Sequence, residues 1–225
     1  MLPNTCNQCH EWTIESWRPI APAFAKPEPS KWSNAQLTLA WLGHSTVLIN
    51  LFGVTILTDP VLFPRVGIRL PGFTIGPKRL TAPALHFHDL PHIDAILLSH
   101  AHFDHLDLRT LRCFDETTRV ITARATSDLL KQSHFSKITE LSWGESKIVS
   151  AATGEMVIAA FPVRHWGART QHGDGRARRA AERSWPEQRR HASRGDATYV
   201  GRTRLSSTSF RATQSGVEES RDFTI

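Results

Sequence analysis

Three histidines and two aspartates are crowded into residues 99–107, which read SHAHFDHLD. The residues just before them, DAILLS, are almost all apolar and predict a buried strand that ends at the first histidine. Alternate residues that leave a strand point to the same side, so His100 and His102 can bind one metal ion. Asp104 and His105 follow where the backbone turns away, and they can bind a second ion beside the first.

Imidazole and carboxylate ligands together suit Zn²⁺, with Fe or Mn as alternatives in a mixed nitrogen and oxygen site. Two metal ions about 3.5–4 Å apart are a known arrangement for hydrolysis. A polar loop with incidental histidines would explain a lone His-x-His. The longer pattern His-x-His-x-Asp-His, directly after a buried strand, is more specific, and it predicts a metal site.

Such a site needs further ligands from other parts of the chain. His165 ends the apolar run MVIAAFPVRHW, and the carboxyl end of a strand is where open sheets place ligands. A structural histidine is the alternative at that position. Asp196 follows a glycine in the segment RGDA, which on its own would also fit a surface turn.

The segments around these residues predict a β-rich domain with helices inserted between strands. We expect an antiparallel meander first and further strands after it, over 37–43, 45–53, 54–60, 93–99, 118–123, 137–143, 146–151 and 156–166. Helical spacing is present over 106–114 and 126–135. This order is typical of a layered α/β domain in which helices cover sheets.

Residues 61–92 hold five prolines and three glycines, and we expect neither strand nor helix there. So long an irregular loop in a domain is usually functional or mobile. The loop begins after Asp59 and ends before the histidine cluster, so it could cover a site, and its apolar residues would suit a greasy substrate. A loop that simply packs on the core is the alternative.

The bulk properties of the 225-residue chain predict one domain over 37–225, preceded by an N-terminal extension over 1–36. No run of 18 apolar residues is present, so we expect no membrane span. Three cysteines fit a reducing compartment, which favours the cytoplasm, with membrane association as an addition. Much of the net charge of +6 comes from arginines between 176 and 194, so we expect no nucleic-acid partner.

The segments WLGHSTVLI, ILTDPV, LLSHAHFDHLD, ELSWGE and PVRHWGAR resemble the metallo-β-lactamase superfamily. The branch they resemble most contains N-acylphosphatidylethanolamine-hydrolysing phospholipase D and the ascorbate-phosphate lactonase-like group. The resemblance covers about residues 41–169, in the family's order and spacing. It implies an αββα four-layer sandwich with a two-zinc site at one edge.

Carried over residue by residue, the resemblance implies first-metal ligands His100, His102 and His165 and second-metal ligands Asp104 and His105. Asp196 would bridge the two ions, because it stands where the family has Gly-Asp-Thr, although Ala197 replaces the threonine. Asp59, at the end of the TDP strand, would support one of the ligands.

The activity implied by the resemblance is metal-dependent hydrolysis by a metal-bound hydroxide, with Asp104 orienting the nucleophile and accepting its proton. The expected substrate is a small-molecule or lipid phosphodiester of the N-acylphosphatidylethanolamine type, with peripheral contact to a membrane. Arg164 or Arg169 would steady the phosphate, and a plain salt bridge is the alternative role for each. A lactonase-type hydrolase is the alternative activity.

Two departures from the family lead to a competing expectation. The Arg-rich residues 171–194 stand where the family has a strand pair rich in glycine and aromatic residues, which suggests a local reading-frame slip. The chain also ends at Ile225, before further strands and a last histidine ligand that the family has. The competing expectation is therefore a truncated metallo-hydrolase fragment that is catalytically inactive.

Overall fold

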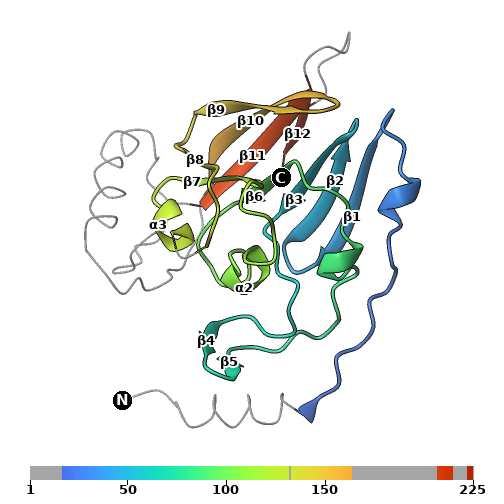
Figure 1. Cartoon of the computed structure of the whole chain (residues 1–225), viewed down its shortest axis with the longest axis vertical. Coiled ribbons are helices and arrows are strands. Elements are labelled where there is room, and N and C mark those ends of the chain that lie inside the picture. The colour runs from blue at the N-terminus through green and yellow to red at the C-terminus, as the bar shows by residue number, and fades with distance from the viewer. Residues whose placement is uncertain (1–16, 132, 164–206, 215–221, 225) are drawn as a thin grey trace, which may run out of the picture.

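The computed structural model describes residues 17–131, 133–163, 207–214 and 222–224, with side chains over 17–131 and 133–161. Two β-sheets dominate this part of the chain (Figure 1). The first has the order β1 (Leu37–Gly43), β2 (Thr46–Leu51), β3 (Val54–Thr58), β6 (Ala95–Leu98), β7 (Arg119–Ala123) and β8 (Ile138–Leu141). The second has the order β12 (Asp222–Thr224), β11 (Ser207–Gln214), β10 (Gly154–Val163) and β9 (Ser146–Ala151).

Strands β1, β2 and β3 form the antiparallel meander that the sequence predicts. Their apolar, β-branched runs favour extended backbone, and the glycines between them allow tight turns. Strands β3, β6, β7 and β8 continue the same sheet in parallel. All four residues of β6 are buried, as is typical of a parallel strand that is covered on both faces.

The two faces of the first sheet are buried against different partners. Alternate residues of β6 show the division, because Leu97 packs with Met156 and Ile158 of β10, whereas Ile96 packs with Leu106 and Leu111. Successive side chains of a strand point to opposite faces. The first core therefore lies between the two sheets, and the second lies under the segments that carry the helices.

The helices are shorter than the sequence predicts. Helix α2 spans Leu108–Leu111, within the expected 106–114, and α3 spans Ser127–Leu130, within the expected 126–135. Both lie on the outer face of the first sheet (Figure 1). Turns, bends and irregular backbone occupy the other described residues of both ranges. No helix among the described residues is long and apolar enough to cross a membrane.

The expectation that residues 61–92 hold no regular structure is wrong. Two strands, β4 (Ile68–Leu70) and β5 (Phe73–Ile75), form an antiparallel hairpin, and a 3-10 turn, η2, spans Phe87–Asp89. A second 3-10 turn, η1 (Pro29–Lys31), precedes β1. The hairpin forms because apolar and polar residues alternate on both sides of a Pro-Gly pair, which favours a tight turn.

The C-terminal part of the chain supplies strands to the second sheet. Strand β12 lies in the terminal segment RDFTI. Strand β11 was not expected, because its sequence STSFRATQ has weak apolar alternation. It pairs with β10 along eight residues, so ladder hydrogen bonds stabilise a strand that its side chains alone do not indicate.

The core between the first sheet and the helices gives a stability prediction. Leu57 is fully buried, so Leu57→Ala should lower the free energy of unfolding by about 2–5 kcal/mol through lost burial and the cavity left behind. Leu39 lies on the same sheet but is 57% exposed, so Leu39→Ala should cost less than about 1 kcal/mol. Urea unfolding measures both, and equal costs would contradict this core assignment.

Candidate metal centre

The carboxyl ends of β3 and β6 meet at one edge of the first sheet, because the two strands are parallel neighbours. Asp59 follows β3, and its backbone N–H donates to the carbonyl of Leu97 over 2.8 Å. Its φ is +38°, a conformation that non-glycine residues seldom adopt. The hydroxyl of Thr46 donates to the Asp59 carbonyl at 2.8 Å, so bonds on both sides fix this backbone.

The buried carboxylate of Asp59 accepts three hydrogen bonds at this edge. The backbone N–H of Ser99 donates to it at 2.7 Å, and the Ser99 hydroxyl donates at 2.6 Å. The ring of His105 donates from Nδ1 at 2.7 Å. Asp59 thereby joins the end of β3 to the end of β6 and to the turn that carries the histidines.

These bonds also determine which ring nitrogen of His105 carries the proton. Since Nδ1–H donates to Asp59, the lone pair of a neutral ring lies on Nε2, which is 3.0 Å from the Ser45 hydroxyl. Burial alone would lower the pKa of His105. The hydrogen bond and charge of Asp59, with a further contribution from Asp104, outweigh it and raise that pKa above its ordinary value.

A relay through Ser99 orients His100 in the same way. The Ser99 hydroxyl gives its only hydrogen to Asp59, so it accepts from Nδ1–H of His100, 2.9 Å away. The lone pair of the His100 ring then lies on Nε2, which faces Nδ1 of His102 at 2.8 Å. His100 is buried, and its ring meets that of His102 at a centroid distance of 4.5 Å. Nδ1–H of His102 therefore donates to Nε2 of His100 in the metal-free rings, and the two imidazoles lie side by side.

A tight turn separates Asp104 from this pair. The backbone N–H groups of His105 and Leu106 both donate to the carbonyl of His102, at 3.1 and 2.8 Å. Leu106 is fully buried and anchors the turn, while Asp107 caps α2 by accepting from two backbone N–H groups. The Asp104 side chain is 55% exposed and lies 3.7 Å from Nε2 of His105.

Two titratable residues beside this edge, His44 and Arg79, were not singled out from the sequence. Burial, and next the charge of Arg79, lower the pKa of His44, while Asp104 opposes them. Arg79 is itself buried and donates to the carbonyls of Val61, Thr81 and Leu42. The sequence did offer an indication of His44, because it lies in WLGHSTVLI, one of the segments that resemble the superfamily. It was assigned no function from the sequence.

A glycine makes room for the buried arginine. Gly43 has a φ of +107°, and a Cβ atom there would lie 2.2 Å from Nη2 of Arg79. Any other residue would both strain the backbone and displace the guanidinium. The end of β1 is thereby held against the base of the 61–92 loop, next to the histidines.

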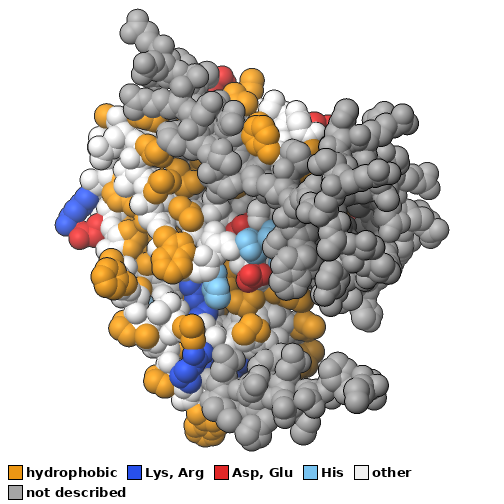
Figure 2. Space-filling view, turned by 180° about the vertical axis from the view of Figure 1, so that it is seen from behind, with side chains coloured by type: hydrophobic (Ala, Val, Ile, Leu, Met, Phe, Trp, Pro, Cys, Tyr) orange, Lys and Arg blue, Asp and Glu red, His pale blue; other side chains and the backbone are white. Residues whose placement is uncertain are grey.

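The structure thus brings together Asp59, His100, His102 and His105, with Asp104 at their exposed side, and histidine and acidic side chains are visible in the middle of one face (Figure 2). The other predicted site residues, namely Arg164, His165, Arg169 and Asp196, lie outside the described residues, as does the segment 171–194. Within the described part, no three side chains of His, Cys, Asp or Glu are arranged to hold one metal ion.

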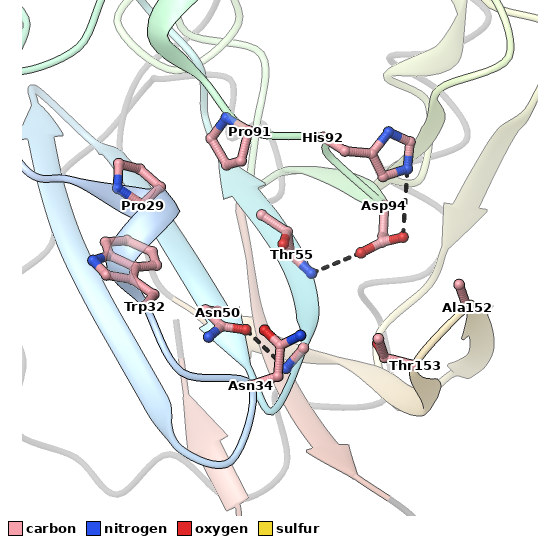
Figure 3. Close-up of a pocket in the computed structure, with 11 residues that line it drawn as sticks. Pro29, Trp32, Asn34, Asn50, Thr55, Pro91, His92, Asp94, Ala152 and Thr153 are labelled. Carbon is pink, nitrogen blue, oxygen red and sulfur yellow. Dashed lines mark hydrogen bonds and ion pairs between the residues drawn. The ribbon is translucent and has the colours of Figure 1, made fainter.

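A cavity of about 290 Å³ lies at the opposite edge of the sheet (Figure 3). It opens near the starts of β3 and β6, whereas the histidines follow the ends of those strands. Asp94 accepts from the backbone N–H of Thr55 at 2.8 Å, and Asn50 accepts from that of Gly53 at 2.8 Å. These polar side chains hold strand ends and a turn in place, so the cavity is separate from the predicted chemistry.

The family model described as beta-lactamase superfamily domain matches residues 55–185, which include the Asp59 edge and the histidine cluster. The chain belongs to this superfamily. It has the metallo-β-lactamase fold that the sequence predicts, with its two sheets as the central layers. Among solved structures, a possible metal-dependent hydrolase from Veillonella parvula has the same fold, with a TM-score of 0.52 at 15% identity, over 84% of this chain and 62% of that one.

Curated relatives agree with this membership. An uncharacterized protein of Mycobacterium tuberculosis is 33% identical over 160 residues, which are 68% of this chain and 40% of that protein. N-acyl-phosphatidylethanolamine-hydrolyzing phospholipase D 1 of Caenorhabditis elegans is 34% identical over 147 residues, 61% of this chain and 40% of that protein. The chain therefore matches about two fifths of the length of these superfamily relatives.

The role of Asp59 as the common acceptor gives a prediction for the metal-free protein. Asp59→Asn removes the negative charge beside His105 while burial remains, so the pKa of the His105 ring should fall. An NMR titration of the histidine ring protons measures it. Asp94→Asn is the matched control, since that carboxylate lies at the opposite edge and should leave His105 unchanged. An unaltered His105 titration in Asp59→Asn would contradict the described network.

Proposed function

We propose that this chain is a metal-dependent hydrolase whose site forms at the Asp59 edge of the first sheet. The observation that carries the proposal is the direct contact between the His100 and His102 rings, with His105 and His100 both oriented from Asp59. Superfamily membership supports the same conclusion. The family model matches residues 55–185, so this support does not depend on the three histidine rings alone.

The donor atoms fit a metal ion of the zinc type. Nε2 of His100 and of His105 carry lone pairs in the neutral rings, which is the form that binds metal. Asp59 supplies the carboxylate behind a metal-binding histidine that commonly fixes its orientation. We propose two ions, Zn²⁺ or alternatively Fe or Mn, held by His100, His102, Asp104 and His105, with His165 and Asp196 from outside the described residues.

When bound, such ions activate water and neutralise charge that develops on the substrate. The chain's own groups would do the rest. Asp104 is the exposed carboxylate beside His105, so it can turn towards an ion, orient the attacking water and accept its proton. The buried guanidinium of Arg79 lies near this edge and, with Arg164 or Arg169, would favour an anionic substrate.

For the substrate we propose a lipid phosphodiester of the N-acylphosphatidylethanolamine type, met at a membrane by a peripheral, cytoplasmic protein. The names of the relatives from Caenorhabditis elegans and from Saccharomyces cerevisiae support this choice, at 34% and 32% identity. A lactone is the alternative substrate. The competing proposal is a protein of the same fold that binds metal weakly and catalyses no hydrolysis.

Bound metal is the first quantity to measure. Monodisperse purified protein should hold about two zinc or iron ions per chain by elemental analysis. His102→Ala should weaken metal binding at least about tenfold, since even the supporting partners of a ligand contribute about 10–100-fold. His92→Ala is the matched control, because His92 is an exposed histidine that lines the cavity at the opposite edge. Equal metal content in both variants would contradict the proposed ligands.

Hydrolysis of N-acylphosphatidylethanolamine in mixed micelles tests the reaction itself. We expect turnover in the metal-loaded protein and a loss of at least about a hundredfold in Asp104→Asn, which cannot accept the proton. A lactone substrate is assayed in parallel. Metal-loaded protein that hydrolyses neither substrate would favour the catalytically inactive alternative, and turnover of the lactone alone would exclude the phosphodiester assignment.

A further inference from the structure

The β4–β5 hairpin presents four large apolar side chains to solvent on one of its faces. Ile68 pairs with Ile75 and Leu70 pairs with Phe73, and residues two apart in a strand share a face. These side chains are 56%, 39%, 37% and 59% exposed, in that order. Arg69 and Thr74 form the intervening pair on the opposite face. The hairpin is therefore an amphipathic ribbon whose apolar face is uncovered.

The ribbon is held away from the two sheets on a well-defined base (Figure 1). Arg65 and Lys78 form a β-bridge, and the backbone N–H of Val66 donates to the carbonyl of Pro77 at 3.1 Å. The two segments at the base of the hairpin lie so close together that a Cβ atom on Gly76 would be 1.9 Å from the Val66 carbonyl oxygen. Backbone contacts at its base therefore fix the hairpin that presents the exposed apolar face.

The Lys, Arg, Asp and Glu residues of the segment that contains the hairpin have one sign of charge. Residues 60–88 contain two arginines, a lysine and the buried Arg79, and no aspartate or glutamate. Arg69 is exposed on the face opposite the apolar side chains, and its long stem lets the guanidinium reach past the edge of the ribbon. Hydrophobic and basic side chains occur together at this lower end of the molecule (Figure 2). Apolar residues flanked by cations complement a surface that is apolar inside and anionic outside.

We propose that the β4–β5 hairpin docks the protein on a membrane surface that carries anionic lipids. The four apolar side chains enter the boundary between headgroups and acyl chains, and the exposed Arg69 remains among the phosphates. This deepens the proposed function, on which it rests for the expectation that the substrate is a lipid. The hairpin lies in the loop between Asp59 and the histidines, so docking brings the site to the lipid surface.

Vesicle flotation of the full chain tests the proposal without any turnover. The protein should float with vesicles of phosphatidylcholine and phosphatidylglycerol and much less with phosphatidylcholine alone, and added salt should weaken binding. Ile68→Ser combined with Phe73→Ser should lower the partition coefficient at least about tenfold. Ile148→Ser, an equally exposed apolar residue on β9, is the matched control and should float like the wild type.

A second variant tests the contribution of charge to vesicle binding without changing the apolar side chains. Arg69→Gln keeps every apolar side chain, so it should weaken binding to the anionic vesicles a few-fold and reduce the salt dependence. Wild-type protein that floats with neither vesicle would overturn the proposal, as would a double variant that floats like the wild type. A change in oligomeric state by light scattering, with flotation unaltered, would assign the face to a second copy instead. Vesicle binding without hydrolysis would leave the docking surface intact and count against the proposed function alone.

Discussion

A single buried carboxylate organises the edge of the sheet on which the candidate site depends. Asp59 accepts hydrogen bonds from the Ser99 backbone, the Ser99 hydroxyl and the His105 ring. An ionised carboxylate only accepts, so each of its partners must donate, and this requirement passes through Ser99 to His100. One acceptor thus places the lone pairs of two rings on their outward nitrogens, which is the arrangement a metal ion requires.

The position of Asp59 in turn depends on the packing of β3 and β6. Both faces of these parallel strands are buried, so their ends are defined by the two cores and not by the loops that follow. Arg79 and Gly43 hold the end of β1 and the base of the 61–92 loop beside that edge. Rigid strand ends therefore carry the groups that must be aligned, while the loop carries exposed apolar side chains.

The sequence predicted the structure where an apolar strand pattern leads directly into residues that can bind a metal ion. The apolar run before His100 and the meander over 37–60 predicted the strands that position the histidine cluster, and the placement of Asp59 at a strand end followed from the TDP segment. Ser99 and His44 could not be assigned because their roles arise from contacts with residues far away in the chain, such as Asp59 and Arg79. Strand β11 was missed because backbone pairing with β10 stabilises it. The β4–β5 hairpin was missed, although apolar and polar residues alternate on both sides of its Pro-Gly pair in the sequence.

The closed base of the hairpin has a consequence for engineering. Because the bridge between Arg65 and Lys78 brings the two ends of this segment together, the residues between them form an insert with a single attachment point. Such a segment can be lengthened, shortened or exchanged for another with little effect on the strand ends that hold Asp59 and His100. The fold therefore offers a graft position at which the exposed apolar surface can be redesigned while the strand ends beside the candidate site are retained.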